Sequence, residues 1–192
     1  MNPVRLRKVQ LYELIPGKPI SDILGDSIIK LKSLSGGVYT KLIRIADYRG
    51  KGFPLRGKLD EQHIDVILQH LKDSSNIEGL TVKLVIRYHY DDELLVIRTI
   101  IDKDRVTVLS RRGVSQSAPT VVGLITDALV EHKAKHLWIP EDSSNPNVYV
   151  TSLETKNIEA KDILNLIDIT YFNRFRKIKV YLDYSYTEPE SV

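Results

Sequence analysis

Residues 120–167, TVVGLITDALVEHKAKHLWIPEDSSNPNVYVTSLETKNIEAKDILNLI, form the most informative stretch of this sequence. Apolar residues at helical spacing predict a helix over residues 117–135. A short apolar strand over residues 137–140, a turn-rich loop, a strand over residues 148–153 and a helix over about residues 159–172 are expected to follow. This order is typical of a unit that holds a ligand, and it contains no catalytic motif.

Residues 81–111 have the strongest strand character in the chain. The runs TVKLVIRYHY, ELLVIRTII and RVTVLSR are separated by the turn candidates Asp91-Asp92 and Asp102-Lys103-Asp104. Short turns between consecutive strands favour antiparallel pairing of neighbours. We therefore predict an antiparallel meander here.

The N-terminal part and the C-terminal end add further elements. Residues 38–46 have the composition of a strand, and a loop rich in glycine and arginine follows them. Asp60 can cap a helix whose apolar residues recur at helical spacing and which should end near residues 73–76. Alternating residues over 176–186 predict a last strand.

Together these elements predict an α+β protein with a mixed sheet, an antiparallel central meander and three main helices. We expect one compact domain over residues 1–192. It could be subdivided into an α/β half (1–76), the meander (81–111) and a ligand-holding half (117–186).

The composition is that of a compact soluble protein, with 42% hydrophobic and 28% charged residues. The net charge of +3 argues against a surface built mainly to neutralise phosphates, although a local basic patch remains compatible with it. The absence of cysteine excludes disulfides and thiolate chemistry and favours a reducing, cytoplasmic location. No apolar run is long enough to span a bilayer, so we expect no membrane association.

The stretch 120–167 resembles a CBS half-module, the β-α-β-β-α unit that occurs in tandem and binds adenosine nucleotides. The resemblance is carried by the helix TVVGLITDALVEHK, the pair Lys135-His136 leading into LWIP, Glu141, the strand VYVTSL and the helix ending DILNLI. A second, degenerate copy could lie within residues 9–71. The resemblance implies a non-enzymatic regulatory subunit that senses AMP or ATP as a ligand and pairs as a homodimer or with a protein partner.

The resemblance also implies a binding cleft in the C-terminal half. An apolar slot would hold the adenine, a hydroxyl or carboxylate the ribose, and a cationic pair the phosphates. Lys135 and His136 could instead be a solvated helix end favoured by the helix dipole, and Asp162 a helix N-terminal charge. The candidate ligand-binding residues are Lys135, His136, Leu137, Ile139, Ser152, Thr155 and Asp162.

A nucleic-acid-binding surface is the alternative function. Two basic stretches are interleaved with aromatic residues, including Tyr48, Phe53 and Tyr181, as backbone contact and base stacking would require. Ordinary solvation of lysine and arginine is the competing explanation. The candidate residues are Arg49, Lys51, Arg56, Lys58, Arg174, Arg176, Lys177 and Lys179.

Other chemistry is weakly supported. His132 and His136 lie one helical turn apart but lack the adjacent glutamate and third ligand of a zinc site, so we predict no metal. No serine elbow or phosphate loop is present, and we expect no enzyme activity. A third hypothesis is a scaffold or assembly subunit, because Tyr184 and Tyr186 stand near the end of an expected edge strand.

Overall fold

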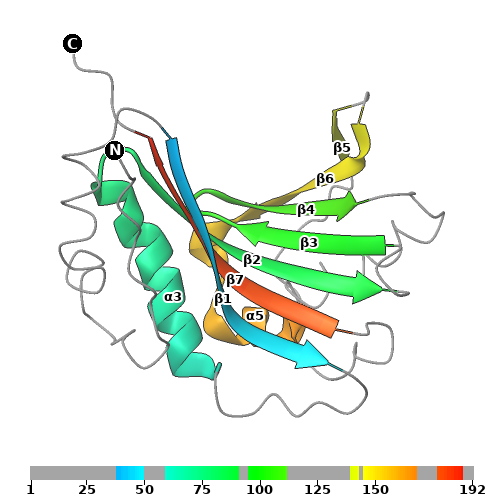
Figure 1. Ribbon diagram of the computed structural model, residues 1–192, viewed down its shortest axis with the longest axis horizontal. Helices are drawn as coiled ribbons and strands as arrows, with labels where there is room; N and C mark the ends of the chain where they lie inside the picture. Colours follow the sequence, from blue (N-terminus) through cyan, green and yellow to red (C-terminus); the bar gives the residue numbers. More distant parts are fainter. Residues whose placement is uncertain are drawn as a thin grey trace.

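The computed structural model describes residues 38–49, 59–90, 95–111, 139–142, 145–167 and 177–187. These residues form one sheet, with the two described α-helices against it (Figure 1). The elements are β1 (Val38–Arg49), α3 (Glu61–Asp73), β2 (Leu80–Tyr90), β3 (Leu95–Ile101), β4 (Arg105–Arg111), β5 (Ile139–Asp142), β6 (Asn145–Glu154), α5 (Ala160–Leu166) and β7 (Lys177–Thr187). Short 3-10 turns follow α3 (Ser74–Asn76) and β6 (Thr155–Asn157).

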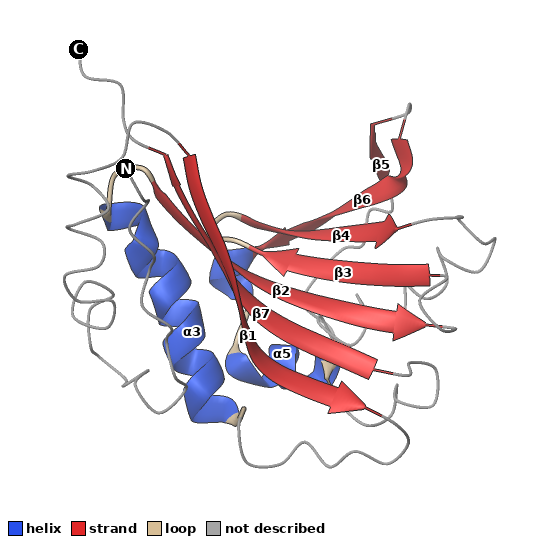
Figure 2. Ribbon diagram, viewed as in Figure 1, coloured by secondary structure: helices blue, strands red, loops and turns tan. Residues whose placement is uncertain are grey.

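The sheet has seven described strands in the order β1-β7-β2-β3-β4-β6-β5, and every described pair is antiparallel. The predicted mixed sheet is therefore wrong. Strands β1 and β2, which precede and follow α3 in the sequence, run in the same direction. Strand β7 lies between them and pairs with both. The two strands that could have formed a parallel pair, β1 and β2, are thus separated by β7, the last described strand (Figure 2).

The prediction of three main helices is also wrong for the described residues, which contain two α-helices. The helix predicted over residues 117–135 lies outside them. The helix predicted to reach Phe172 ends at Leu166, and Ile167 is its C-cap. The prediction of an antiparallel meander over residues 81–111 agrees with the structure, because β2, β3 and β4 pair consecutively across this range.

Helix α3 forms as the sequence predicts. The Asp60 carboxylate accepts the backbone N–H of His63 at 2.9 Å and so satisfies one of the free donors of the first turn. The apolar side of the helix is buried against the sheet, and its C-cap is Ser74. The predicted cap and the predicted end of this helix are both confirmed.

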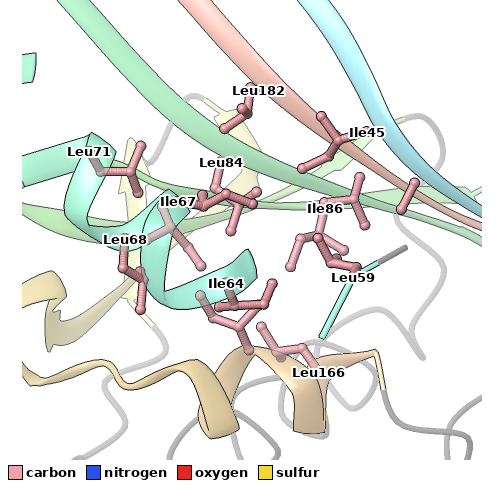
Figure 3. Packing of buried hydrophobic residues seen from close by; sticks show 14 of the residues in the cluster. Ile45, Leu59, Ile64, Ile67, Leu68, Leu71, Leu84, Ile86, Leu166 and Leu182 are labelled. Carbon is pink, nitrogen blue, oxygen red and sulfur yellow. The ribbon is translucent and has the colours of Figure 1, made fainter. Parts of the chain in front are cut away.

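One hydrophobic core joins α3, α5 and one face of the sheet. Figure 3 shows Ile64 and Ile67 of α3 among the strand residues Leu84 and Ile86, with Leu166 of α5 opposite. Each fully buried aliphatic side chain of this kind contributes about 1.5–3 kcal/mol to folding. The face of the sheet that packs against α3 and α5 therefore stabilises the fold. We call the opposite face of the sheet the second face.

Strand β7 separates the two faces most clearly, because its residues alternate strictly between buried and half-buried. The buried set belongs to the core, and it comprises Ile178, Val180, Leu182, Tyr184 and Tyr186. Tyr184 and Tyr186 are 0% and 1% exposed, and β7 is an interior strand. The expectation that these two tyrosines stand on an edge strand, available for assembly, is therefore wrong.

A buried polar pair connects α3 to β7 within this core. His70 Nε2 lies 3.1 Å from the hydroxyl of Tyr184, and the two rings meet edge to face. Burial lowers the pKa of His70 from 6.5 to about 4, against a smaller opposing effect of Asp73. The imidazole is thus held neutral in the folded protein at neutral pH.

The pH dependence of stability should reveal His70. Because its pKa is about 4 in the folded state and 6.5 when unfolded, the unfolded chain takes up the proton first as the pH falls. The contribution of neutral His70 to the free energy of unfolding is complete above pH 6.5. It is lost as the pH falls towards 4, by up to about 1.4 kcal/mol per pH unit. Urea unfolding at pH 7 and pH 5 should show a smaller loss for His70→Gln than for the wild type. Equal losses would contradict the assignment.

Gly79 fixes the start of β2 against the end of β7. Its φ angle is +82°, and its carbonyl oxygen accepts the N–H of Thr187 at 2.8 Å. A Cβ at this position would overlap the carbonyl oxygen of Thr187. The glycine is therefore required both for its backbone conformation and for close approach of the two chains.

Gly79→Ala should lower the free energy of unfolding by about 1–3 kcal/mol, because the new side chain strains the backbone and pushes against β7. Chemical denaturation measures this change. Glu78→Ala is the matched control, since Glu78 is the exposed neighbour in the same turn. A loss of stability in the control as large as in Gly79→Ala would show that the turn is simply sensitive to any substitution.

Candidate nucleic-acid interface

The candidate nucleotide-binding residues are only partly described. Lys135, His136 and Leu137 lie outside the described residues. The backbone places Ile139 at the start of β5 and Ser152 within β6. Only Thr155 and Asp162 can be followed as side chains, and both lie at the junction of β6 and α5.

Asp162 is the third residue of α5, and its Oδ2 accepts the backbone N–H of Glu159 at 2.9 Å. This is half of a reciprocal capping box, and the carboxylate is part of a residue that is only 6% exposed. Thr155 is 1% exposed, and its N–H donates to the carbonyl oxygen of Asp104 at 3.3 Å. The geometry accounts for Asp162 as a support of the β6–α5 junction, whereas the buried hydroxyl of Thr155 has no hydrogen-bond partner among the described residues.

The candidate nucleic-acid-binding residues are also only partly described. Lys51, Arg56, Lys58, Arg174 and Arg176 lie outside the described residues. Arg49 ends β1, and Lys177 and Lys179 stand at the start of β7. The register pairs Arg49 directly with Lys177. The strand ends that adjoin the two basic stretches in sequence are thus neighbours in the sheet.

Lys179 belongs to a row of three cations across adjacent strands. It is paired with Arg87 of β2, and Arg87 is paired with Arg98 of β3. Adjacent strands lie about 4.8 Å apart. All three residues are half-buried and belong to the face opposite the core, because their sequence neighbours on each strand are fully buried on the core side. We call Lys179, Arg87 and Arg98 the cation row.

Two carboxylates of the described strands, Asp47 and Asp183, share the second face with the cation row. Asp47 pairs with Lys179 in the register and forms an ion pair with Arg44 at 3.3 Å. Asp183 lies two residues after Tyr181 on β7, and its cross-strand partner on β2 is Lys83. Burial raises the pKa of Asp183, while Lys83 and Arg87 act in the opposite direction. Within the described strands, the register places no carboxylate between the members of the cation row.

The aromatic component of the face is Tyr181, which pairs with Val85 in the register. The guanidinium carbon of Arg87 lies 4.7 Å from the centre of the Tyr181 ring, a distance typical of a cation–π contact. Tyr48, which the sequence suggested as a stacking residue, lies on the opposite face and is 6% exposed. Its burial raises its pKa to about 12, so it belongs to the core.

Sequence reasoning missed Lys83, Arg87 and Arg98 as members of this site. Their signal was present in the alternation of TVKLVIRYHY, where Lys83 and Arg87 occupy the same side of the strand. What the alternation cannot reveal is that β7 would bring Lys179 beside them.

Comparison with protein-family models, with curated proteins and with solved structures finds no match. The resemblance of residues 120–167 to a CBS half-module therefore stays a prediction from the sequence. Within the described ranges, no three histidine, aspartate or glutamate side chains come together as a metal-binding group. None of the helices described is long and apolar enough to cross a membrane.

Asp162→Ala should lower the free energy of unfolding by about 0.5–2 kcal/mol, because the backbone N–H of the N-cap residue Glu159 loses its acceptor. Thermal melts with and without millimolar AMP measure whether the residue also holds a ligand. A supporting role predicts the same loss in both conditions. A wild-type stabilisation by AMP that disappears in Asp162→Ala would instead restore the nucleotide-binding assignment.

Proposed function

We propose that the protein is a non-enzymatic nucleic-acid-binding protein and that the second face of its sheet is the binding surface. The single observation that carries this proposal is the cation row on three adjacent strands. Like charges directly opposite each other destabilise a sheet, so a bound anion that bridges the three cations would stabilise this arrangement. A line of phosphates is such an anion.

The distribution of charge over the two sides supports the same function. The exposed side of α3 and its flanking turns carry a set of acidic residues, namely Asp60, Glu61, Asp65, Asp73 and Glu78. The cation row lies on the other side of the sheet from this helix. A net charge of only +3 therefore conceals a separation of charge that can orient a polyanion towards the second face.

The register provides a further argument, because it joins the sheet surface to the two basic stretches found in the sequence. Arg49 leads into the first stretch, and Lys177 lies in the second. Arg49 and Lys177 are cross-strand partners, and Lys177 lies two residues before Lys179 on β7. The described ends of the two basic stretches, Arg49 and Lys177, are therefore neighbours in the sheet next to the cation row.

The nucleotide-sensing alternative has less support from the described residues. Its carboxylate, Asp162, already accepts a backbone hydrogen bond within α5. A second carboxylate oxygen remains, but the residue is 6% exposed. The basic surface is consequently the arrangement that the described geometry favours.

Lys179→Gln should weaken nucleic-acid binding without weakening the fold. Removing one phosphate contact should make the slope of log K against log salt shallower by about 0.7 for a single strand or about 0.9 for a duplex. Fluorescence anisotropy with a labelled 20-nucleotide oligomer and a matched duplex, between 50 and 200 mM salt, measures this slope. The melting temperature should stay within error, because Lys179 has a like charge, Arg87, on one side and an opposite charge, Asp47, on the other.

Lys72→Gln is the matched control, because Lys72 is exposed in the last turn of α3, on the core side of the sheet. It removes the same charge and should leave the slope unchanged. An equal effect of both variants would mean that only net charge matters. Binding by the wild type that is absent or insensitive to salt would refute the proposed function.

A further inference from the structure

A row of uncharged residues runs beside the cation row on the same face. Tyr181, Val85 and Ile100 are paired with one another across β7, β2 and β3. Each stands two residues along its strand from a member of the cation row. Two residues of a strand span about 7 Å, so the two rows are parallel lines at that separation. We call these three residues the apolar row.

The two rows match the two sides of a single nucleic-acid strand. Phosphates require cations, whereas exposed bases require flat apolar or aromatic surface. The spacing of about 7 Å between rows is comparable to the separation between a phosphate and its own base. Tyr181 and Ile100 are half-buried and Val85 between them is 4% exposed, so Tyr181 and Ile100 supply the accessible surface of the row.

The contact between Arg87 and Tyr181 joins the two rows. The guanidinium lies over the ring at 4.7 Å, which restricts both side chains and fixes the charge next to the aromatic surface. A guanidinium plane is itself a surface on which an unpaired base can stack. Beyond the apolar row, Asp183 is paired with Lys83 in the register. Its carboxylate disfavours phosphates on that side and leaves the cation row as the favoured line for the backbone.

We propose that the ligand is single-stranded nucleic acid, which crosses the strands of the sheet with its backbone along the cation row and its bases over Tyr181 and Ile100. This inference rests on the proposed function and adds the strandedness of the ligand. In a duplex the bases are stacked inside and offer no free faces to an apolar row. Only the cation row would then be used.

Three ligands of equal length separate these contributions in anisotropy titrations at fixed salt. They are a 20-nucleotide single strand, a 20-base-pair duplex and a 20-unit abasic strand that carries the phosphates without the bases. The wild type should bind the single strand roughly tenfold or more tightly than the abasic strand, because it alone stacks on the apolar row. It should also prefer the single strand to the duplex.

Tyr181→Leu should weaken binding of the single strand roughly tenfold and leave binding of the abasic strand unchanged. Tyr181→Phe retains the ring and should bind like the wild type, which also controls for loss of the Arg87 contact. Equal wild-type affinity for all three ligands, with Lys179→Gln still impaired, would overturn this inference and leave the proposed function intact. Absence of salt-dependent binding to every ligand would overturn both.

Discussion

The position of β7 between β1 and β2 is the constraint on which the rest of the structure depends. This strand pairs with both neighbours along nearly its whole length, and its side chains alternate strictly between the two faces. On one side it supplies the middle of the hydrophobic core, and on the other it supplies Lys179, Tyr181 and Asp183. A shift of its register by one residue would exchange the two sets, so the core also fixes the chemistry of the second face.

The individual elements were largely readable from the sequence, because their signals are local. Asp60 marked the start of α3, and alternation marked the strands of the 81–111 region and the final strand. The arrangement of these elements was not readable. Nothing in the sequence around β7 states that it will insert between two strands far earlier in the chain, so the sheet was expected to be mixed and Tyr184 to lie near an edge.

The candidate site was hidden for the same reason. Lys179 was identified in a basic stretch, but Arg87 and Arg98 each occur alone in apolar strands, where solvation is the usual explanation. The three form a row only through two separate strand pairings. Asp162 shows a second role that its residue type does not reveal: a carboxylate suited to ribose binding also caps a short helix.

The two faces illustrate how local conflict can be tolerated in a stable protein. The core face combines apolar burial with a capped helix and a glycine that lets β2 approach β7. The second face places three like charges side by side, an arrangement that is unfavourable in a sheet, with the carboxylates Asp47 and Asp183 beside them. Departures of this kind from local consistency are expected at functional sites.

The most direct test is to map backbone amide resonances while an oligonucleotide is added to the isotope-labelled protein. If the second face binds the oligonucleotide, the largest shifts among the described residues should fall on residues 85–89, 98–100 and 177–183, with little change along α3. Shifts concentrated on residues 155–167, or spread evenly over the helical side, would contradict the claim that the second face of the sheet is the binding surface.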